Sequence, residues 1–157
     1  MCASFVSWTT CQATPEEDRR TLPGDALIAH PVVSLTYAIT IDVPPDRVWP
    51  WLVQMGCGRA GWYSYDWLDN GGRPSATTID PAWQQVAIGD VLPGAPGMRE
   101  AFVVIDVVPA RMLLLGVPAE HTEPTPAYEA RADMSVSAAG TAGVGMTWCF
   151  VLDETTA

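Results

Sequence analysis

Basic residues are scarce in this chain. Lys and Arg together number 8, against 18 Asp and Glu, so the formal net charge is −10 at pH 7. A negative surface of this size repels the phosphate backbone of nucleic acids and the head groups of anionic lipids. We therefore expect no nucleic-acid partner.

Long apolar stretches are also missing. No run approaches the roughly 18 apolar residues that a membrane-spanning helix needs, and Met1–Thr10 lacks the basic residue and the long apolar segment of a secretion signal. Hydrophobic residues nevertheless make up 48% of the chain and charged ones only 17%, which favours a packed core over disorder. We expect a soluble, cytoplasmic protein with no membrane span.

Metal-ligand and cofactor motifs are absent as well. His30 and His121 lie far apart, and no cysteine stands at metal-ligand spacing from either, so we expect no metal. The glycine-rich stretch Gly140–Gly145 carries no lysine and opens no helix, which predicts a hairpin turn rather than a phosphate-binding loop, and no cofactor. Wide spacing predicts reduced thiols for the four cysteines, Cys2, Cys11, Cys57 and Cys149.

The length of 157 residues fits one domain. Residues 1–31 are polar and interrupted by prolines, which predicts a loosely packed N-terminal leader with a helical turn near Glu16–Arg20. Residues 32–157 form the predicted domain.

Periodicity predicts an α+β fold. Apolar and small polar residues alternate over Val33–Ile41, the strongest strand pattern of the chain. Val48, Trp51, Leu52 and Met55 then recur on one face of a helix that ends at Gly56, and a second short helix is expected within Gly58–Gly72. The later predicted strands are Asp90–Leu92, Phe102–Val108, Arg111–Val117, Asp133–Ser137 and Gly145–Asp153.

Two segments after the first predicted strand carry a family resemblance. They run over Ile41–Gly56 (IDVPPDRVWPWLVQMG) and Arg59–Leu68 (RAGWYSYDWL), and Pro23–Asp25, Gly89–Asp90 and Trp148–Phe150 fit the same pattern. The chain from about Thr21 onward resembles the SRPBCC superfamily, the polyketide-cyclase/START-like proteins.

The resemblance implies a helix-grip fold. In that fold a curved antiparallel sheet, usually of seven strands, surrounds an apolar cavity, with two short helices after the first strand and a long C-terminal helix. The sequence after Asp153 carries neither a further strand nor that helix, so the chain resembles a truncated member. An uncovered sheet face would expose apolar surface, which predicts association into a homodimer through that face.

A small hydrophobic or aromatic ligand, lipid-like or polyketide-like, is the expected partner. Flat aromatic rings suit such ligands, although packing of the short helix is the alternative role for the aromatic residues. Arg59 offers a planar set of donors for the polar end of a ligand, and the alternative is an ion pair with Asp66 or Asp69. The candidate ligand-binding residues are Trp51, Met55, Arg59, Trp62, Tyr63, Tyr65, Trp67 and Trp148.

Two further functions remain open at this point. A cyclase or dehydratase would need a proton donor or acceptor beside the ligand, for which Tyr65, Asp66, Arg59 and Asp106 are the candidates, and no spacing singles one out. The third hypothesis is a truncated, non-functional domain that only self-associates.

Overall fold

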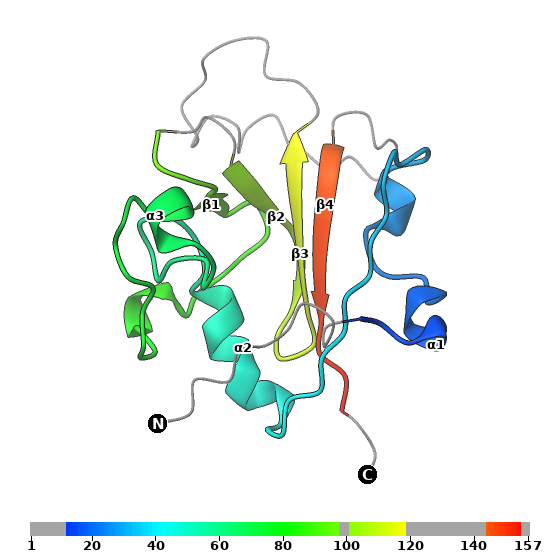
Figure 1. The fold of residues 1–157 in the computed structure, drawn as a ribbon, viewed down its shortest axis with the longest axis horizontal. Coiled ribbons are helices and arrows are strands. Elements are labelled where there is room, and N and C mark those ends of the chain that lie inside the picture. The colour runs from blue at the N-terminus through cyan, green and yellow to red at the C-terminus, as the bar shows by residue number, and fades with distance from the viewer. Residues whose placement is uncertain (1–11, 98–100, 119–143, 155–157) are drawn as a thin grey trace.

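A computed structural model describes residues 12–97, 101–118 and 144–154. This part of the chain is α+β, with a four-stranded antiparallel sheet in the order β1-β2-β3-β4 (Figure 1). The strands are β1 (Val91–Pro93), β2 (Ala101–Val108), β3 (Met112–Pro118) and β4 (Val144–Val151). Short helices precede them: α1 (Pro15–Asp18), η2 (Asp25–Leu27), α2 (Pro45–Val53), α3 (Asp66–Asp69) and η3 (Pro81–Trp83).

The β2–β3 hairpin forms the centre of the sheet. The amide of Arg111 donates to the carbonyl of Val108 at 3.0 Å, and Ala110 takes a positive φ of 56° in the tight turn between the strands. Both strands are rich in β-branched and leucine residues, and their sequence-predicted bounds are confirmed to within a residue. A register shift between Val104 and Asp106 marks a bulge in β2.

One face of the sheet, here called the α2 face, packs against the chain that follows α2. Leu113 and Leu115 of β3 are fully buried on this face, together with Leu92 and Val104. They contact Met55 and Trp62, while Trp49 and Leu52 of α2 pack around the edge of the cluster. Burial of each such leucine stabilises the fold by about 1.5–3 kcal/mol.

The opposite face, here called the η2 face, carries a smaller apolar cluster. Ile105, Met112 and Leu114 are buried there, and Leu27 of η2 packs against them. Gly24, just before η2, has a φ of +99°, and a Cβ on it would lie 2.6 Å from Cδ1 of Leu114. A glycine is thus required where the N-terminal segment approaches the sheet.

Most of the predicted elements are present. The helical turn near Glu16–Arg20 corresponds to α1, the first predicted helix to α2, and the second to α3, which has only four residues. The strands predicted at Asp90–Leu92 and Gly145–Asp153 correspond to β1 and β4. The predicted strand Asp133–Ser137 and residues 140–143 of the predicted turn lie outside the described residues.

The prediction of a strand at Val33–Ile41 is wrong. Among the described residues, Tyr37 is the only member of this segment that forms a β-bridge, to Gln12, and no named strand includes the segment. The apolar row of the alternation is exposed: Val33, Leu35, Tyr37, Ile39 and Ile41. The backbone is extended, as alternation requires, but a strand also needs hydrogen-bonded neighbours, and periodicity does not supply those.

None of the described helices is long and apolar enough to cross a membrane.

Gly24→Ala should destabilise the fold by about 2–3 kcal/mol, because alanine is strained at this φ and its methyl group would also meet buried Leu114. Gly72→Ala is the matched control, since Gly72 has a φ of +75° but open space around its Cβ position, and should cost about 1 kcal/mol. Urea unfolding followed by circular dichroism measures both. Equal losses in the two variants would contradict the close approach of η2 to the sheet.

Candidate functional site

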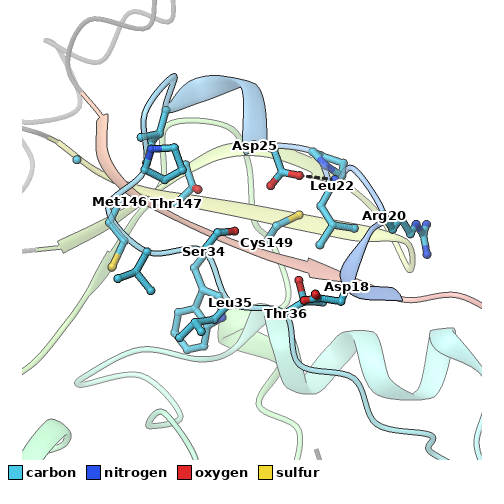
Figure 2. Close-up of a pocket in the computed structure, with 17 residues that line it drawn as sticks. Asp18, Arg20, Leu22, Asp25, Ser34, Leu35, Thr36, Met146, Thr147 and Cys149 are labelled. Carbon is cyan, nitrogen blue, oxygen red and sulfur yellow. Dashed lines mark hydrogen bonds between the residues drawn. The ribbon is translucent and has the colours of Figure 1, made fainter. Parts of the chain in front are cut away.

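A groove lies between β4 and the extended segment that leads from η2 to α2. Its volume is about 310 Å³, and residues 33–36 form one wall while Gly145–Cys149 form the other. The segment runs beside β4 in Figure 1, and Figure 2 shows the groove from close by. The residues between α1 and η2 close the groove at a third side.

The two sides of β4 present different chemistry to this groove. In Figure 2, Asp25, Leu22 and the Cys149 thiol lie on one side of the β4 ribbon, and Met146 and Leu35 lie on the other. This agrees with the strand register, which places Cys149 opposite Leu114 and Trp148 opposite Leu115. One side of the groove is therefore apolar and aromatic, and the other is acidic.

The apolar side of the groove continues into an aromatic cluster. Trp148 stacks on Trp62 with ring centroids 5.9 Å apart and an interplanar angle of 23°, and its ring lies 4.6 Å from that of Phe150. Phe102 contacts both tryptophans at centroid distances of 5.1 and 5.8 Å. Trp148 is 43% exposed, so the cluster presents an open ring edge to the groove.

Apart from Arg59, the predicted ligand-binding residues are divided among four environments. Met55 and Trp62 are buried in the core, and the Trp62 indole donates to the carbonyl of Gly94 at 2.7 Å. Trp51 and Tyr63 form an edge-to-face pair at 6.0 Å. Tyr65 and Trp67 are exposed, the latter to 75%. Trp148 alone of the predicted set is among the groove's lining residues.

Arg59 serves the end of helix α2. Its Nη2 donates to the carbonyl of Val53 at 2.7 Å, one of the carbonyls that the last helical turn leaves without a helical partner. The guanidinium lies 4.8 Å above the Trp83 ring, and burial lowers the pKa of Arg59 despite the nearby charge of Asp90. No ion pair joins Arg59 to Asp66 or Asp69 among the described residues, so that alternative is wrong.

Asp66 organises the loop that follows Trp62. Its carboxylate accepts hydrogen bonds from the Ser75 hydroxyl and, at 3.0 Å, from the Ser75 amide. These bonds hold the pKa of Asp66 below the ordinary aspartate value of 3.8. The Ser75 hydroxyl in turn accepts from the amide of Tyr63 at 3.1 Å. Asp66 is therefore an ionised structural group, not a proton donor near neutral pH.

Gln54 is a fully buried polar residue that sequence reasoning missed. Its side-chain amide donates to the Tyr63 hydroxyl and to the carbonyl of Thr78, and its oxygen accepts from the amide of Asp80 at 3.0 Å. The network joins the end of α2 to the loop before η3. A glutamine next to the apolar face of a helix carries no sequence pattern that indicates this role.

The groove's own residues were also missed as ligand-binding candidates. Val33, Leu35 and Met146 were assigned to the inner faces of strands, where they would pack in the core rather than line a ligand site. Asp25 and Asp18 belong to the segment predicted as a leader. Their proximity to β4 arises from a long-range return of the chain, which no local pattern in the sequence indicates.

The described cysteines and histidine add no reactive site. Cys57 and Cys149 are free thiols, and burial raises the pKa of Cys149 to about 11, with the charges of Asp25 and Asp106 adding to the effect. Cys149 is thus protonated and a poor nucleophile at neutral pH. His30 is exposed, and the described residues contain no group of three or more potential metal ligands. His121, Cys2 and Cys11 lie outside the described residues.

Comparison with known proteins finds no matching family, no matching curated protein and no matching solved structure. The resemblance to the SRPBCC superfamily thus stays a prediction from the sequence motifs.

Asp66→Asn should remove a pH-dependent part of the stability. Because the pKa of Asp66 is lower in the folded state, its contribution is present above pH 3.8 and is lost as the pH falls through the folded-state pKa. We expect the melting temperatures of wild type and Asp66→Asn to differ at pH 6, and the difference to shrink as the pH falls below 3.8. In a Ser75→Ala background the difference at pH 6 should shrink, and an undiminished difference would contradict the Ser75 origin of the shift.

Arg59→Lys should destabilise the protein by about 1–2 kcal/mol without ligand present, because lysine keeps the charge but not the planar contact with Trp83 and the Val53 carbonyl. Arg47→Lys on the exposed surface of α2 is the control and should leave stability unchanged within about 0.5 kcal/mol. Chemical denaturation measures both variants. Equal stability of Arg59→Lys and wild type would refute the capping role.

Proposed function

We propose that this protein binds a small hydrophobic or aromatic molecule in the groove between β4 and residues 33–36. The observation that carries the proposal is the set of exposed apolar side chains on the groove walls, namely Val33, Leu35, Met146 and Trp148. Apolar surface left in water costs about 25 cal/mol per Å², so a ligand that covers these side chains gains that free energy on binding. Trp148 offers a ring on which a flat ligand can stack.

The groove volume restricts the size of this ligand. About 310 Å³ stands at the lower end of the range for small-molecule sites, roughly 300–1,000 Å³. A bicyclic aromatic or a medium-chain alcohol fits this volume better than a sterol does. The acidic side chains of Asp18 and Asp25 at the rim favour a ligand whose polar end is neutral or positive.

The helix-grip architecture is part of the same proposal. An antiparallel sheet of sequentially ordered strands with α2 and α3 before it is compatible with that fold, and it supports reading the groove as one mouth of a cavity. We further propose a cytoplasmic location, which the two free described thiols favour.

Ligand binding is favoured over cyclase chemistry by the positions of the titratable groups. Tyr65, Asp66 and Arg59 are not among the groove's lining residues, and Asp66 and Arg59 are engaged in structural hydrogen bonds. Asp106 accepts a hydrogen bond from the amide of Val107 at 2.8 Å and likewise is not among the lining residues. None of these four candidates is therefore within reach of a ligand in the groove, as cyclase chemistry by them would require.

Self-association is the second candidate, because the same exposed apolar row can be covered by another copy of the chain. A homodimer of this kind would bury Ile39 and Ile41 as well as the groove walls. Sedimentation measurements across a range of protein concentrations separate this case from ligand binding.

Thermal melting with 2-naphthol, 1-decanol and cholesterol tests the proposal. Binding to the folded state alone at about 100 times the dissociation constant stabilises by about 2.7 kcal/mol, which raises the melting temperature by roughly 5–10 °C for a domain of this size. We expect this shift with 2-naphthol or 1-decanol and none with cholesterol. No shift with any of the three would contradict the proposal.

Two matched variants, Leu35→Asp and Ile39→Asp, test whether the ligand binds in the groove. Both residues belong to the same apolar row and are 70% and 62% exposed, but only Leu35 lines the groove. We expect Leu35→Asp to abolish the ligand-induced shift and Ile39→Asp to preserve it, with similar melting temperatures for the two variants without ligand. Loss of the shift in both variants would place the ligand elsewhere on the row.

A further inference from the structure

The two edges of the sheet differ in how they are protected. The β1 edge is only three residues long and ends in Pro93, whose carbonyl accepts a hydrogen bond from the amide of Cys57 at 2.9 Å. The β4 edge is eight residues long and contains neither proline nor a charged residue (VGMTWCFV). Unprotected edges of this kind readily pair with another extended chain.

Backbone groups of β4 point into the groove. The amide of Leu152 donates to the carbonyl of Arg111 at 2.8 Å, which identifies their pairing as a directly hydrogen-bonded one. Alternation along the antiparallel ladder then directs the amides and carbonyls of Phe150, Trp148 and Met146 toward β3. The amides and carbonyls of Cys149 and Thr147 point away from β3. Thr147 and Cys149 both line the groove.

The opposite wall of the groove does not satisfy these groups. Residues 33–36 are extended and lie beside β4, but among the described residues no ladder or backbone hydrogen bond joins the two segments. Residues 33–36 and the side of β4 that faces away from β3 therefore lie across the groove from each other, with no backbone hydrogen bond between them in the described part of the chain. A third extended chain between these two segments supplies hydrogen-bond partners for the backbone of each.

We propose that the β4 edge binds an extended peptide of another protein, which adds to the sheet as a fifth strand. Only the central residues of the peptide lie in the groove of about 310 Å³, and its ends extend beyond the groove. The peptide's amides and carbonyls pair with those of Thr147 and Cys149. This mode of recognition draws affinity from the backbone and specificity from alternate side chains. The peptide would use the same groove as the proposed small molecule, but this proposal rests on the hydrogen-bonding edge of β4, which the small-molecule proposal does not use.

The two sides of the groove define the chemistry of the peptide. Side chains that point toward the α2 face meet Leu35, Met146 and Trp148, so apolar residues are favoured there. Side chains that point toward the η2 face meet Cys149 and Asp25, with Asp18 also at the rim. Arg20 is engaged by Asp153, and the chain carries a net charge of −10. The peptide should therefore alternate apolar and polar residues and carry positive charge.

Amide hydrogen exchange followed by NMR tests the pairing. The probe is an acetylated and amidated seven-residue peptide in which valine and threonine alternate between two terminal lysines. In the free protein the amides of Met146, Trp148 and Phe150 should be protected and those of Thr147 and Cys149 should exchange rapidly. At about ten times its dissociation constant, the peptide should slow exchange at Thr147 and Cys149 about tenfold.

Other results overturn the proposal. Protection of Thr147 and Cys149 in the dilute free protein would mean that residues 33–36 already pair with β4. Protection that grows with protein concentration alone would assign the edge to a second copy of the chain. Unchanged exchange with the peptide would rule out strand addition. 2-Naphthol cannot produce alternating protection along β4. The exchange experiment therefore tests strand addition alone, and the melting experiment tests small-molecule binding alone.

Charge variants test the preference for a positively charged peptide. Asp18→Asn should weaken binding of the lysine peptide about two- to fivefold, as expected for one exposed charge contact. Asp42→Asn, at an exposed position that is not among the groove's lining residues, is the control and should have no effect. A peptide with glutamates in place of the lysines should bind more weakly than the lysine peptide. Equal binding of the two peptides would refute the charge preference.

Discussion

β3 sends side chains into both halves of the core, Leu113 and Leu115 toward α2 and Met112 and Leu114 toward η2. It pairs with β2 on one side and with β4 on the other, so its backbone is satisfied along both edges. The four side chains are at most 7% exposed. β2 and β4 pair with β3 directly, and residues of α2 and η2 pack against the clusters that its side chains form. β4 is held in place by its hydrogen bonds to β3, so its outer edge is held in place as well.

The helical side of the molecule combines an apolar layer with buried polar anchors. Trp62 packs on the sheet, and the segment around it is held by Gln54, Arg59 and Asp66, each of which bonds to backbone groups. Gln54 is fully buried, where a polar group is costly unless it is hydrogen-bonded, while Arg59 and Asp66 are partly exposed. Together the hydrogen bonds of these three residues define one arrangement of the loops after α2. That rigidity gives Trp148 a fixed aromatic partner beside the groove.

The groove exists because the N-terminal segment returns along the sheet without joining it. Gly24 permits a close approach at η2, and the chain then passes β4 as an extended segment whose apolar row is exposed. Unpaired backbone and uncovered apolar side chains thus lie in one place. Both features are destabilising in isolation, and both are relieved by a bound partner, whether it covers the side chains or pairs with the strand.

The sequence by itself determined the α+β class, the hairpin of β2 and β3, and helix α2, because each depends on local periodicity and turn chemistry. The alternation at Val33–Ile41 correctly indicated extended backbone. Whether that backbone becomes a strand depends on a neighbour far away in the chain, and here only Tyr37 has one. The roles of Arg59 and Asp66 likewise followed from the carbonyl of Val53 and from Ser75 rather than from charge patterns. Only the tertiary structure decided these points, because hydrogen-bond partners and burial are properties of the packed chain and not of any local stretch of it.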